Sequence, residues 1–199
     1  MNSLRAAAIR IVVGIAALLL LACAVYFLWR ERPALVGTLA PEGSQPPETS
    51  RAMLITSPSF ENNGMIPKKF TCDGGNMNPE LQVHNIPPGA KSLALILHDS
   101  DAPVKGGFTH WVVWNISPAT TLVRQESVPQ GGVEGRNSSG KTGYTGPCPP
   151  PGAPHHYEFR FYALDTVLAL PLTTQKADLE AAMAGHILEE TALVGLYQR

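Results

Sequence analysis

The sequence predicts a mostly β fold: an antiparallel β-sandwich with one C-terminal helix, preceded by a single transmembrane helix. Three observations lead to this prediction. Short runs of β-branched and aromatic residues alternate with turns rich in glycine, proline and asparagine, only one stretch of the domain has helical spacing, and a long uncharged apolar run lies near the N-terminus. Strands followed by a single late helix favour a sandwich over alternating βαβ units.

Residues 11–29 are the predicted transmembrane helix, within a membrane anchor at 1–30. These residues carry no charge, and as a helix they would cover about 28 Å, close to the ~30 Å hydrocarbon thickness of a bilayer. Two alternatives stay open. One is a cleaved signal peptide, although its apolar region usually has only about 7–15 residues. The other is lipidation at Cys23, which ends a Leu-Leu-Ala-Cys sequence but is followed by further apolar residues.

Residues 31–51 are predicted to form a flexible linker, because they contain four prolines and no apolar periodicity. A coil of this length reaches on the order of 25 Å. Arginines flank the apolar run equally on both sides, so charge alone does not set its orientation. The free amino terminus and the lack of a long preceding domain favour a C-terminal domain outside the cytoplasm, which is periplasmic in a bacterium.

The predicted domain, 52–199, contains six expected strands at 52–56, 81–84, 92–98, 108–116, 157–164 and 192–197. A helix is expected to start near Thr174 or Gln175 and to end near Glu190. Its apolar face comprises Leu179, Ala182, Met183 and Ile187. Only 16% of the chain is charged, the formal net charge is −1, and no basic stripe is present. We therefore expect no nucleic-acid partner.

Two polar loops are the candidate functional site. The first is Asp99-Ser100-Asp101-Ala102-Pro103, with His110 in the strand after it. The second runs from Gly143 through a proline-rich stretch to Gly152, with His155-His156-Tyr157 following. Loops held by strands can present polar groups in a fixed geometry. We interpret the two loops as opposite walls of one pocket.

Residues 135–142, Gly-Arg-Asn-Ser-Ser-Gly-Lys-Thr, match the letters of the phosphate-binding P-loop pattern. That motif requires a helix that begins at its Lys-Thr, with the helix N-terminus facing the phosphates. Two glycines and four prolines follow within nine residues here, so no helix can start at this point. We predict a glycine-rich loop beside the pocket and not a nucleotide site.

Several motifs occur in a specific order: Phe-Thr-Cys-Asp-Gly at 70–74, Asp-Ser-Asp-Ala-Pro at 99–103, Gly-Phe-Thr-His-Trp at 107–111, Gly-Tyr-Thr-Gly-Pro-Cys-Pro-Pro at 143–150, His-His-Tyr at 155–157 and Gly-His-Ile-Leu at 185–188. Over about 60–199 the chain thereby resembles the bacterial branch of the phosphatidylethanolamine-binding protein family, also called Raf kinase inhibitor-like. The resemblance implies a β-sandwich with a small anion-binding pocket and no established cofactor or catalytic activity. The implied ligand-binding residues are Asp99, Asp101, Pro103, His110, Gly146, Pro149, Pro150, His155 and Tyr157. Ser100 departs from the family's usual Asp-Pro-Asp-Ala-Pro, which leaves this loop less rigid.

The expected chemistry is recognition of a small phosphate-bearing or zwitterionic head group. His110 and His155 would donate hydrogen bonds to the anion, Asp99 or Asp101 would orient the imidazoles, and backbone N–H groups around Gly146 would add donors. His84, His98, His156 and His186 are more often structural in such positions, and His186 is expected on the apolar face of the helix. We expect a binding protein with no enzymatic activity, no cofactor and no metal, attached to the membrane through its N-terminal helix.

Two other functions are compatible with these residues. A metal-dependent hydrolase or transferase could use the Asp-x-Asp motif with the histidines, but the sequence has no His-Glu-x-x-His or Gly-x-Ser-x-Gly motif. Alternatively, the rim of the same pocket could bind a protein target such as a kinase or a protease.

Cys72 and Cys148 are the two cysteines of the predicted domain. An even pair in an oxidising compartment is a candidate disulfide. Two free thiols packed as small apolar groups are the alternative, because a disulfide needs Cα atoms within about 7 Å and the sequence does not give that distance.

Overall fold

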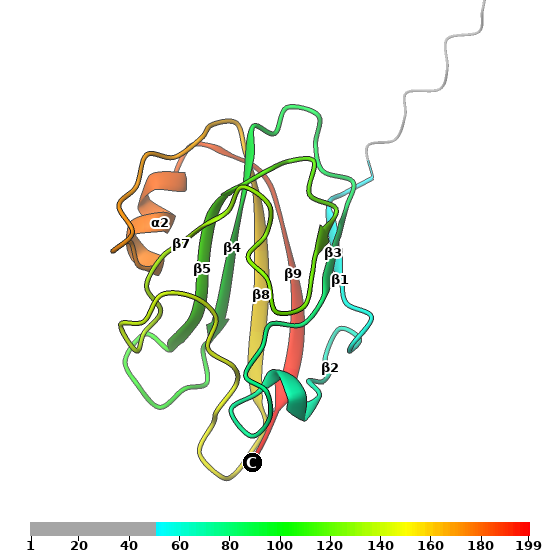
Figure 1. Ribbon diagram of the computed structural model, residues 1–199, viewed down its shortest axis with the longest axis vertical. Coiled ribbons are helices and arrows are strands. Elements are labelled where there is room, and N and C mark those ends of the chain that lie inside the picture. The colour runs from blue at the N-terminus through cyan, green and yellow to red at the C-terminus, as the bar shows by residue number, and fades with distance from the viewer. Residues whose placement is uncertain (1–50) are drawn as a thin grey trace, which may run out of the picture. The chain divides into compact units, whose positions relative to one another are not determined.

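The computed structural model describes residues 51–199. The predicted membrane anchor and nearly all of the linker lie outside the described residues. Within residues 51–199, no helix combines the length and the apolar character needed to cross a membrane. The elements, shown in Figure 1, are β1 (Leu54–Thr56), β2 (Gly64–Met65), η1 (Lys68–Phe70), β3 (Leu81–His84), β4 (Ser92–Asp99), β5 (Phe108–Ile116), β6 (Leu122–Val123), β7 (Val133–Glu134), β8 (His155–Leu164), α2 (Lys176–Met183) and β9 (Ile187–Tyr197).

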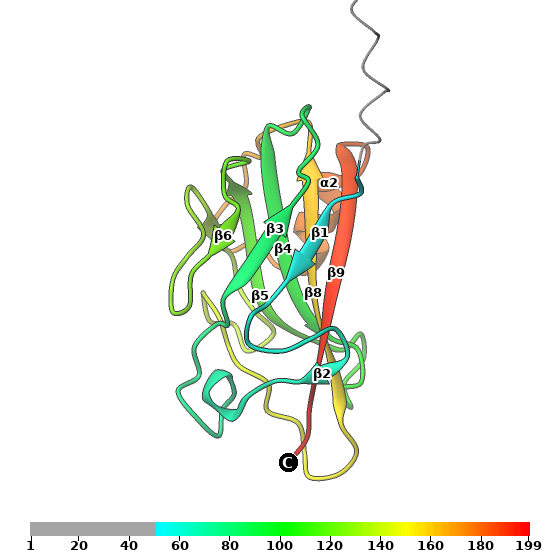
Figure 2. The ribbon, with the colours of Figure 1, turned by 90° about the vertical axis from the view of Figure 1, so that its right-hand side faces the viewer.

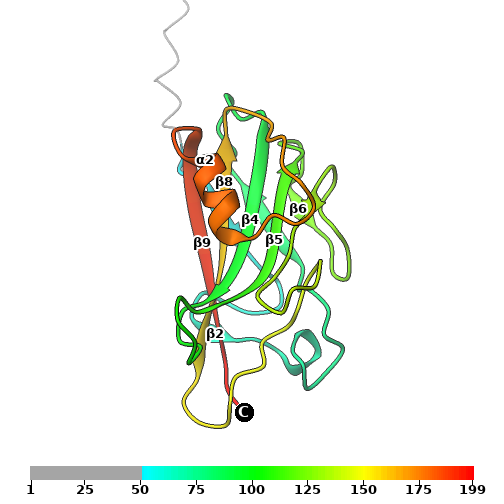
Figure 3. The ribbon, with the colours of Figure 1, turned by 90° about the vertical axis from the view of Figure 1, so that its left-hand side faces the viewer.

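These strands form two sheets. The larger has six strands in the order β2-β9-β8-β4-β5-β7, and the smaller has three in the order β1-β3-β6. All pairings are antiparallel except β2 with β9. Figure 2 shows the small sheet lying over one face of the large sheet, and Figure 3 shows α2 lying over the opposite face. For residues 51–199, the predicted mostly β fold with one α-helix is therefore confirmed.

The large sheet is buried on both faces, which explains the nearly uninterrupted apolar sequence of its central strands. Side chains alternate along a strand. In β4, Leu93, Leu95 and Leu97 belong to the core beneath the small sheet. Ala94 and Ile96 point the other way and belong to the core beneath α2. β5 and β8 divide their side chains between the two cores in the same manner.

The helix starts where the sequence indicates but ends earlier. Gln175 is its N-cap and forms a capping box with Asp178, and Leu179 and Met183 are buried against the sheet. The expected extension to Glu190 is wrong. Gly185, with φ 82°, reverses the chain in a conformation that suits glycine at a helix end, and Ile187 then begins β9.

His186 consequently lies in the turn before β9 and not on the apolar face of a helix, as the sequence had suggested. Its side chain is exposed, and its Nδ1 lies 2.8 Å from Asp165 Oδ1. The correction follows directly from the earlier helix end, because residues after Met183 no longer share the helical spacing.

Candidate functional site

The two polar loops meet at one end of the large sheet. β4 ends at Asp99, which pairs with Phe108 at the start of β5 and with Tyr157 near the start of β8. The ends of these strands and the loops next to them enclose a cavity of about 180 Å³. It is lined by Asp99, Ala102, Pro103, Val104, Phe108, His110, Thr145, Gly146, Cys148, Pro149, Pro150, His155 and Tyr157. We call it the strand-end pocket.

Asp99 orients His155 within this pocket. Asp99 is almost fully buried, and its Oδ2 lies 2.8 Å from His155 Nδ1. The other carboxylate oxygen, Oδ1, accepts a hydrogen bond from the backbone N–H of Asp101 at 2.9 Å. Both oxygens are thus engaged inside the protein. The imidazole of His155 is held by Nδ1, which leaves Nε2 for a ligand.

His110 is held in a similar way by a backbone carbonyl. Its Nδ1 lies 2.7 Å from the carbonyl oxygen of Thr145, and since a carbonyl only accepts, Nδ1 carries the proton. Burial lowers the pKa of His110, although the hydrogen bond to Thr145 and the negative charge of Asp99 act in the opposite direction. In the neutral ring Nε2 then carries a lone pair, and it becomes a donor only when the ring is protonated.

The hydroxyl group of Tyr157 makes no hydrogen bond of good geometry to the described residues, although it lies near the Asp99 carboxylate and the backbone of Cys148. The side chain is fully buried and lines the pocket. Burial raises the pKa of this hydroxyl, and the neighbouring Asp99 carboxylate adds to the effect, so the group keeps its proton at physiological pH. Buried polar groups are nearly always hydrogen-bonded. This hydroxyl is therefore a buried polar group of the pocket wall whose hydrogen-bonding capacity is not fully used within residues 51–199.

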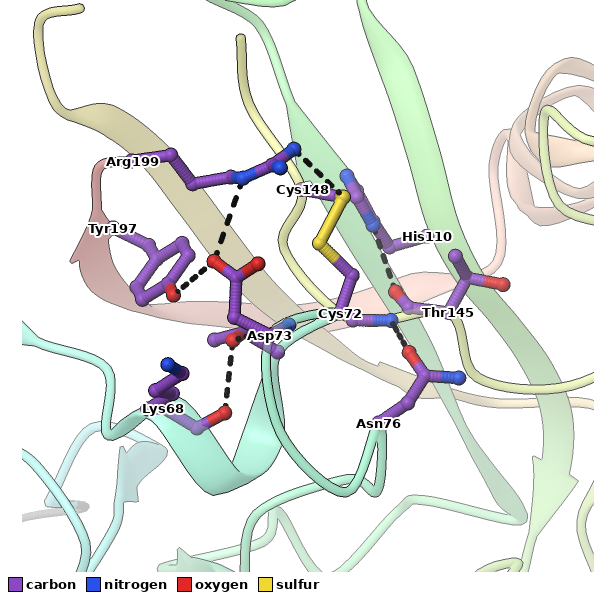
Figure 4. Close-up of a disulfide and its surroundings, with 11 residues drawn as sticks. Lys68, Cys72, Asp73, Asn76, His110, Thr145, Cys148, Tyr197 and Arg199 are labelled. Atoms are coloured by element: carbon purple, nitrogen blue, oxygen red, sulfur yellow. Dashed lines mark hydrogen bonds and ion pairs between the residues drawn. A yellow bond between two sulfur atoms is a disulfide. The ribbon is translucent and has the colours of Figure 1, made fainter. Parts of the chain in front are cut away.

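The proline wall of the pocket, residues 146–150, is fixed to residues 68–76. Cys148 forms a disulfide with Cys72, with Cα atoms 5.4 Å apart, which decides between the two alternatives that the sequence left open. The backbone N–H of Cys72 donates to the carbonyl of Pro147 at 3.1 Å. Figure 4 shows the disulfide beside Asp73, Tyr197 and Arg199, with Arg199 Nη1 3.5 Å from Cys148 Sγ.

Gly146 does not supply the backbone donor that the sequence suggested. Its N–H already donates a hydrogen bond to Asn76 Oδ1 at 2.7 Å. What the position requires is the absence of a side chain, because a Cβ there would lie 2.6 Å from the carbonyl oxygen of Phe70. The glycine lets the proline wall pack directly against the neighbouring loop.

Comparison with known proteins identifies the family. Residues 56–198 match the family model described as phosphatidylethanolamine-binding protein. The chain belongs to the phosphatidylethanolamine-binding protein family. A UPF0098 protein of Methanothermobacter thermautotrophicus is 48% identical over 152 residues, covering 74% of this chain and 99% of the relative. One of Pyrococcus horikoshii is 45% identical over 155 residues, covering 73% and 77% respectively.

Solved structures of bacterial members of the phosphatidylethanolamine-binding protein family share the fold. A homologue from Chlamydia trachomatis matches with a TM-score of 0.71 and 40% identity, covering 75% of this chain and 99% of its own. YbcL of E. coli, described as a new member of the mammalian family, matches with a TM-score of 0.71 and 29% identity over the same shares. These similarities confirm the bacterial branch that the ordered motifs indicated.

One residue implied by the family resemblance lies outside the strand-end pocket. Asp101 does not line the cavity. Its Oδ2 accepts hydrogen bonds from the backbone N–H of His156 at 2.8 Å and from His156 Nδ1 at 2.7 Å, and these bonds lower the pKa of Asp101. Asp101 therefore ties the first loop to the start of β8. The other eight residues named from the sequence line the cavity together.

The sequence prediction missed several lining residues of this family member, of which Phe108 is the most informative. Its ring centroid lies 4.7 Å from that of His110. Residues two apart on a strand share a face, so a histidine at 110 already indicates that residue 108 faces the same cavity. Val104 and Thr145 carry no such signal, because their positions depend on how the loops fold.

The alternative metal site has no support in the geometry of residues 51–199. The two aspartates of Asp-x-Asp bind different histidines, one inside the pocket and one outside it. No group of three or more histidine, cysteine, aspartate or glutamate side chains in this part of the chain is arranged to hold a metal ion. A larger groove of about 580 Å³ lies beside β3 and β6, and its lining contains a single ionisable side chain, His84, which is too few ligands for a metal site.

Proposed function

We propose that this phosphatidylethanolamine-binding protein homologue binds a small phosphate-bearing head group in the strand-end pocket. The observation that carries the proposal is the unpartnered, buried hydroxyl of Tyr157 in the same cavity as the imidazoles of His110 and His155. The hydroxyl is a permanent donor, and the two Nε2 atoms become donors on protonation. Three donors that converge on one small cavity suit an anion with several oxygens.

The rest of the pocket suits the organic part of such a ligand. Pro103, Val104, Phe108, Pro149 and Pro150 give it an apolar lining, which is typical of small-molecule sites. Both oxygens of Asp99 are engaged within the protein, so the ammonium of a zwitterionic ligand would have to lie nearer the rim. The exposed Val104 also makes the rim a surface on which a protein target could be held, as a second use of the same pocket.

The binding domain is proposed to work outside the cytoplasm, attached to the membrane through residues 11–29. The uncharged apolar run motivates this part of the proposal. The disulfide between Cys72 and Cys148 supports it, because disulfides persist mainly in oxidising compartments.

Calorimetric titration of the full-length chain in non-ionic detergent with glycerophosphoethanolamine tests the binding proposal. His110→Ala and His155→Ala should each weaken binding by about 10- to 150-fold, since each removes one charge-assisted hydrogen bond. His84→Ala is the matched control, because His84 is exposed on β3 and bonds Thr56. Unchanged affinity in both pocket variants would overturn the proposal.

A further inference from the structure

The loop with the letters of a P-loop forms a different kind of site. As predicted, no helix follows it: Arg136 and Thr142 pair as an isolated antiparallel bridge. The carboxamide Oδ1 of Asn137 accepts hydrogen bonds from the backbone N–H groups of Ser139 and Lys141, at 3.0 and 3.2 Å. The loop is thus closed on itself by a buried asparagine.

This loop forms one side of a second cavity, of about 300 Å³, which we call the basic hollow. Its lining comes from three segments of the chain and comprises Lys105, Gly106, Gly107, Thr109, Arg136, Asn137, Ser138, Gln175, Lys176 and Ala177. None of these residues lines the strand-end pocket.

Backbone hydrogen bonds hold the segments around the hollow in place. The N–H of Arg136 donates to the carbonyl of Thr174, directly before α2, at 2.8 Å. Ser138 is joined to Thr109 of β5 twice, by its N–H donating to the Thr109 carbonyl at 2.9 Å and by its Oγ accepting from the Thr109 N–H at 2.8 Å. The hollow is therefore a defined part of the fold.

The charged side chains that line the hollow are all cationic. Lys105, Arg136 and Lys176 line it, and no carboxylate does. Within residues 51–199, Lys105 and Arg136 make no ion pair, whereas Lys176 pairs with Glu180 at 2.9 Å. Lys105 and Arg136 therefore lie at the hollow without a counter-charge from the described residues, and an anion bound there would supply one.

The geometry points to a second anion-binding site in the basic hollow, for a phosphate dianion such as inorganic phosphate or a small phosphomonoester. Arginine binds phosphate oxygens through its planar fork, and lysines act as point charges beside it. The side chains of Thr109, Ser138 and Gln175 offer neutral polar groups at the same cavity. A volume of about 300 Å³ lies at the lower end of the range for small-molecule sites, which exceeds a bare phosphate and admits a small organic substituent.

Titration of the full-length chain in non-ionic detergent with inorganic phosphate and with glycerol 3-phosphate tests this site. Arg136→Gln and Lys105→Gln should each weaken binding of both probes by about tenfold or more. Arg124→Gln removes the same charge from an exposed position that does not line the hollow, and it should leave binding unchanged. Because the strand-end pocket is itself proposed to bind phosphate-bearing groups, the Arg136→Gln and Lys105→Gln changes are also made in His155→Ala, where they should cause the same loss of affinity.

The other outcomes each overturn the site. If neither probe binds the wild-type chain, the site is not there. If Arg136→Gln and Arg124→Gln lose the same affinity, the probes are attracted by net charge only. Loss in His155→Ala alone would assign phosphate binding to the strand-end pocket. The site does not rest on head-group binding, so failure of the glycerophosphoethanolamine titration leaves this test intact.

Discussion

Each imidazole of the strand-end pocket uses Nδ1 within the protein. Asp99 holds His155, and the carbonyl of Thr145 holds His110. The tautomers are therefore set before any ligand arrives, and the Nε2 atoms remain for binding. With the buried hydroxyl of Tyr157, these side chains are the groups that we propose engage several oxygens of one ligand at once.

Tyr157→Phe should separate binding from stability. The change removes a buried hydroxyl that makes no hydrogen bond of good geometry within residues 51–199, so the free energy of unfolding should change by less than about 1 kcal/mol. Affinity for glycerophosphoethanolamine should fall about tenfold, measured by calorimetry. Tyr144→Phe is the contrasting variant: its hydroxyl donates to the Phe70 carbonyl at 2.8 Å, and its loss should lower stability by about 1 kcal/mol. A Tyr157→Phe variant with full affinity would contradict the assigned role.

Binding of a phosphodiester should strengthen as the pH falls. His110 must gain a proton before Nε2 can donate, and burial lowers its pKa, so the neutral ring predominates at pH 8. Anion binding is then coupled to proton uptake, and affinity should rise by up to about tenfold per pH unit as the pH is lowered toward 6. A phosphodiester keeps one negative charge over this range. The profile should be flatter in His110→Ala, and tighter binding at higher pH would contradict the coupling.

Among the elements, strands with strong patterns could be predicted and short or ambiguous ones could not. The expected bounds 81–84 and 108–116 agree with β3 and β5, because bulky and β-branched residues there are bounded by turns. β2, β6 and β7 have two residues each, too few to show a period. The start of β9 was assigned to the helix because Ile187 continues the helical spacing of Leu179 and Met183, whereas pairing with β8 decides its structure.

The site was predictable to the extent that its residues belong to family motifs. The sequence could not separate Asp99 from Asp101, since either could face the cavity. Asp99 is still in β4, two residues after Leu97, in a register with β8 that is unbroken from Ser92 to Asp99, whereas Asp101 lies beyond the strand, where its position depends on how the loop folds. The use of the Gly146 N–H by Asn76 is a contact between distant loops, and no local pattern signals it.

The disulfide should stabilise both the fold and the proline wall. It closes a loop with a sequence separation of 76, which corresponds to about 4 kcal/mol in the chain-entropy model. Replacing Cys72 and Cys148 together by alanine should lower the free energy of unfolding by about 2–4 kcal/mol in urea titrations of the full-length chain. Cys23→Ala is the control that leaves this pair intact. Equal unfolding midpoints for the two variants would show that the disulfide does not constrain the chain.

At the scale of the whole molecule, the pocket lies far from the start of the described chain. β1 begins toward one end of the sandwich, whereas β4 ends and β8 begins at the other, where the C-terminus also lies (Figure 1). The strand-end pocket and the start of β1 therefore lie toward opposite ends of the described domain.

A reporter that is active only outside the cytoplasm, fused after Ser50, tests the proposed location. The apolar run at 11–29 should export it, giving an active reporter, whereas a fusion that begins at Arg51 should be inactive. A silent Ser50 fusion that is expressed at a normal level would place the domain in the cytoplasm and remove the expected oxidising environment of the disulfide.

The most direct measurement is a crystal structure of the protein grown with glycerophosphoethanolamine. We expect density for the phosphate group within hydrogen-bond distance of the Tyr157 hydroxyl and of the Nε2 atoms of His110 and His155, with the organic part against Phe108 and Pro149. Phosphate density only in the basic hollow, or in the groove beside β3 and β6, would contradict the central claim that the strand-end pocket binds the head group.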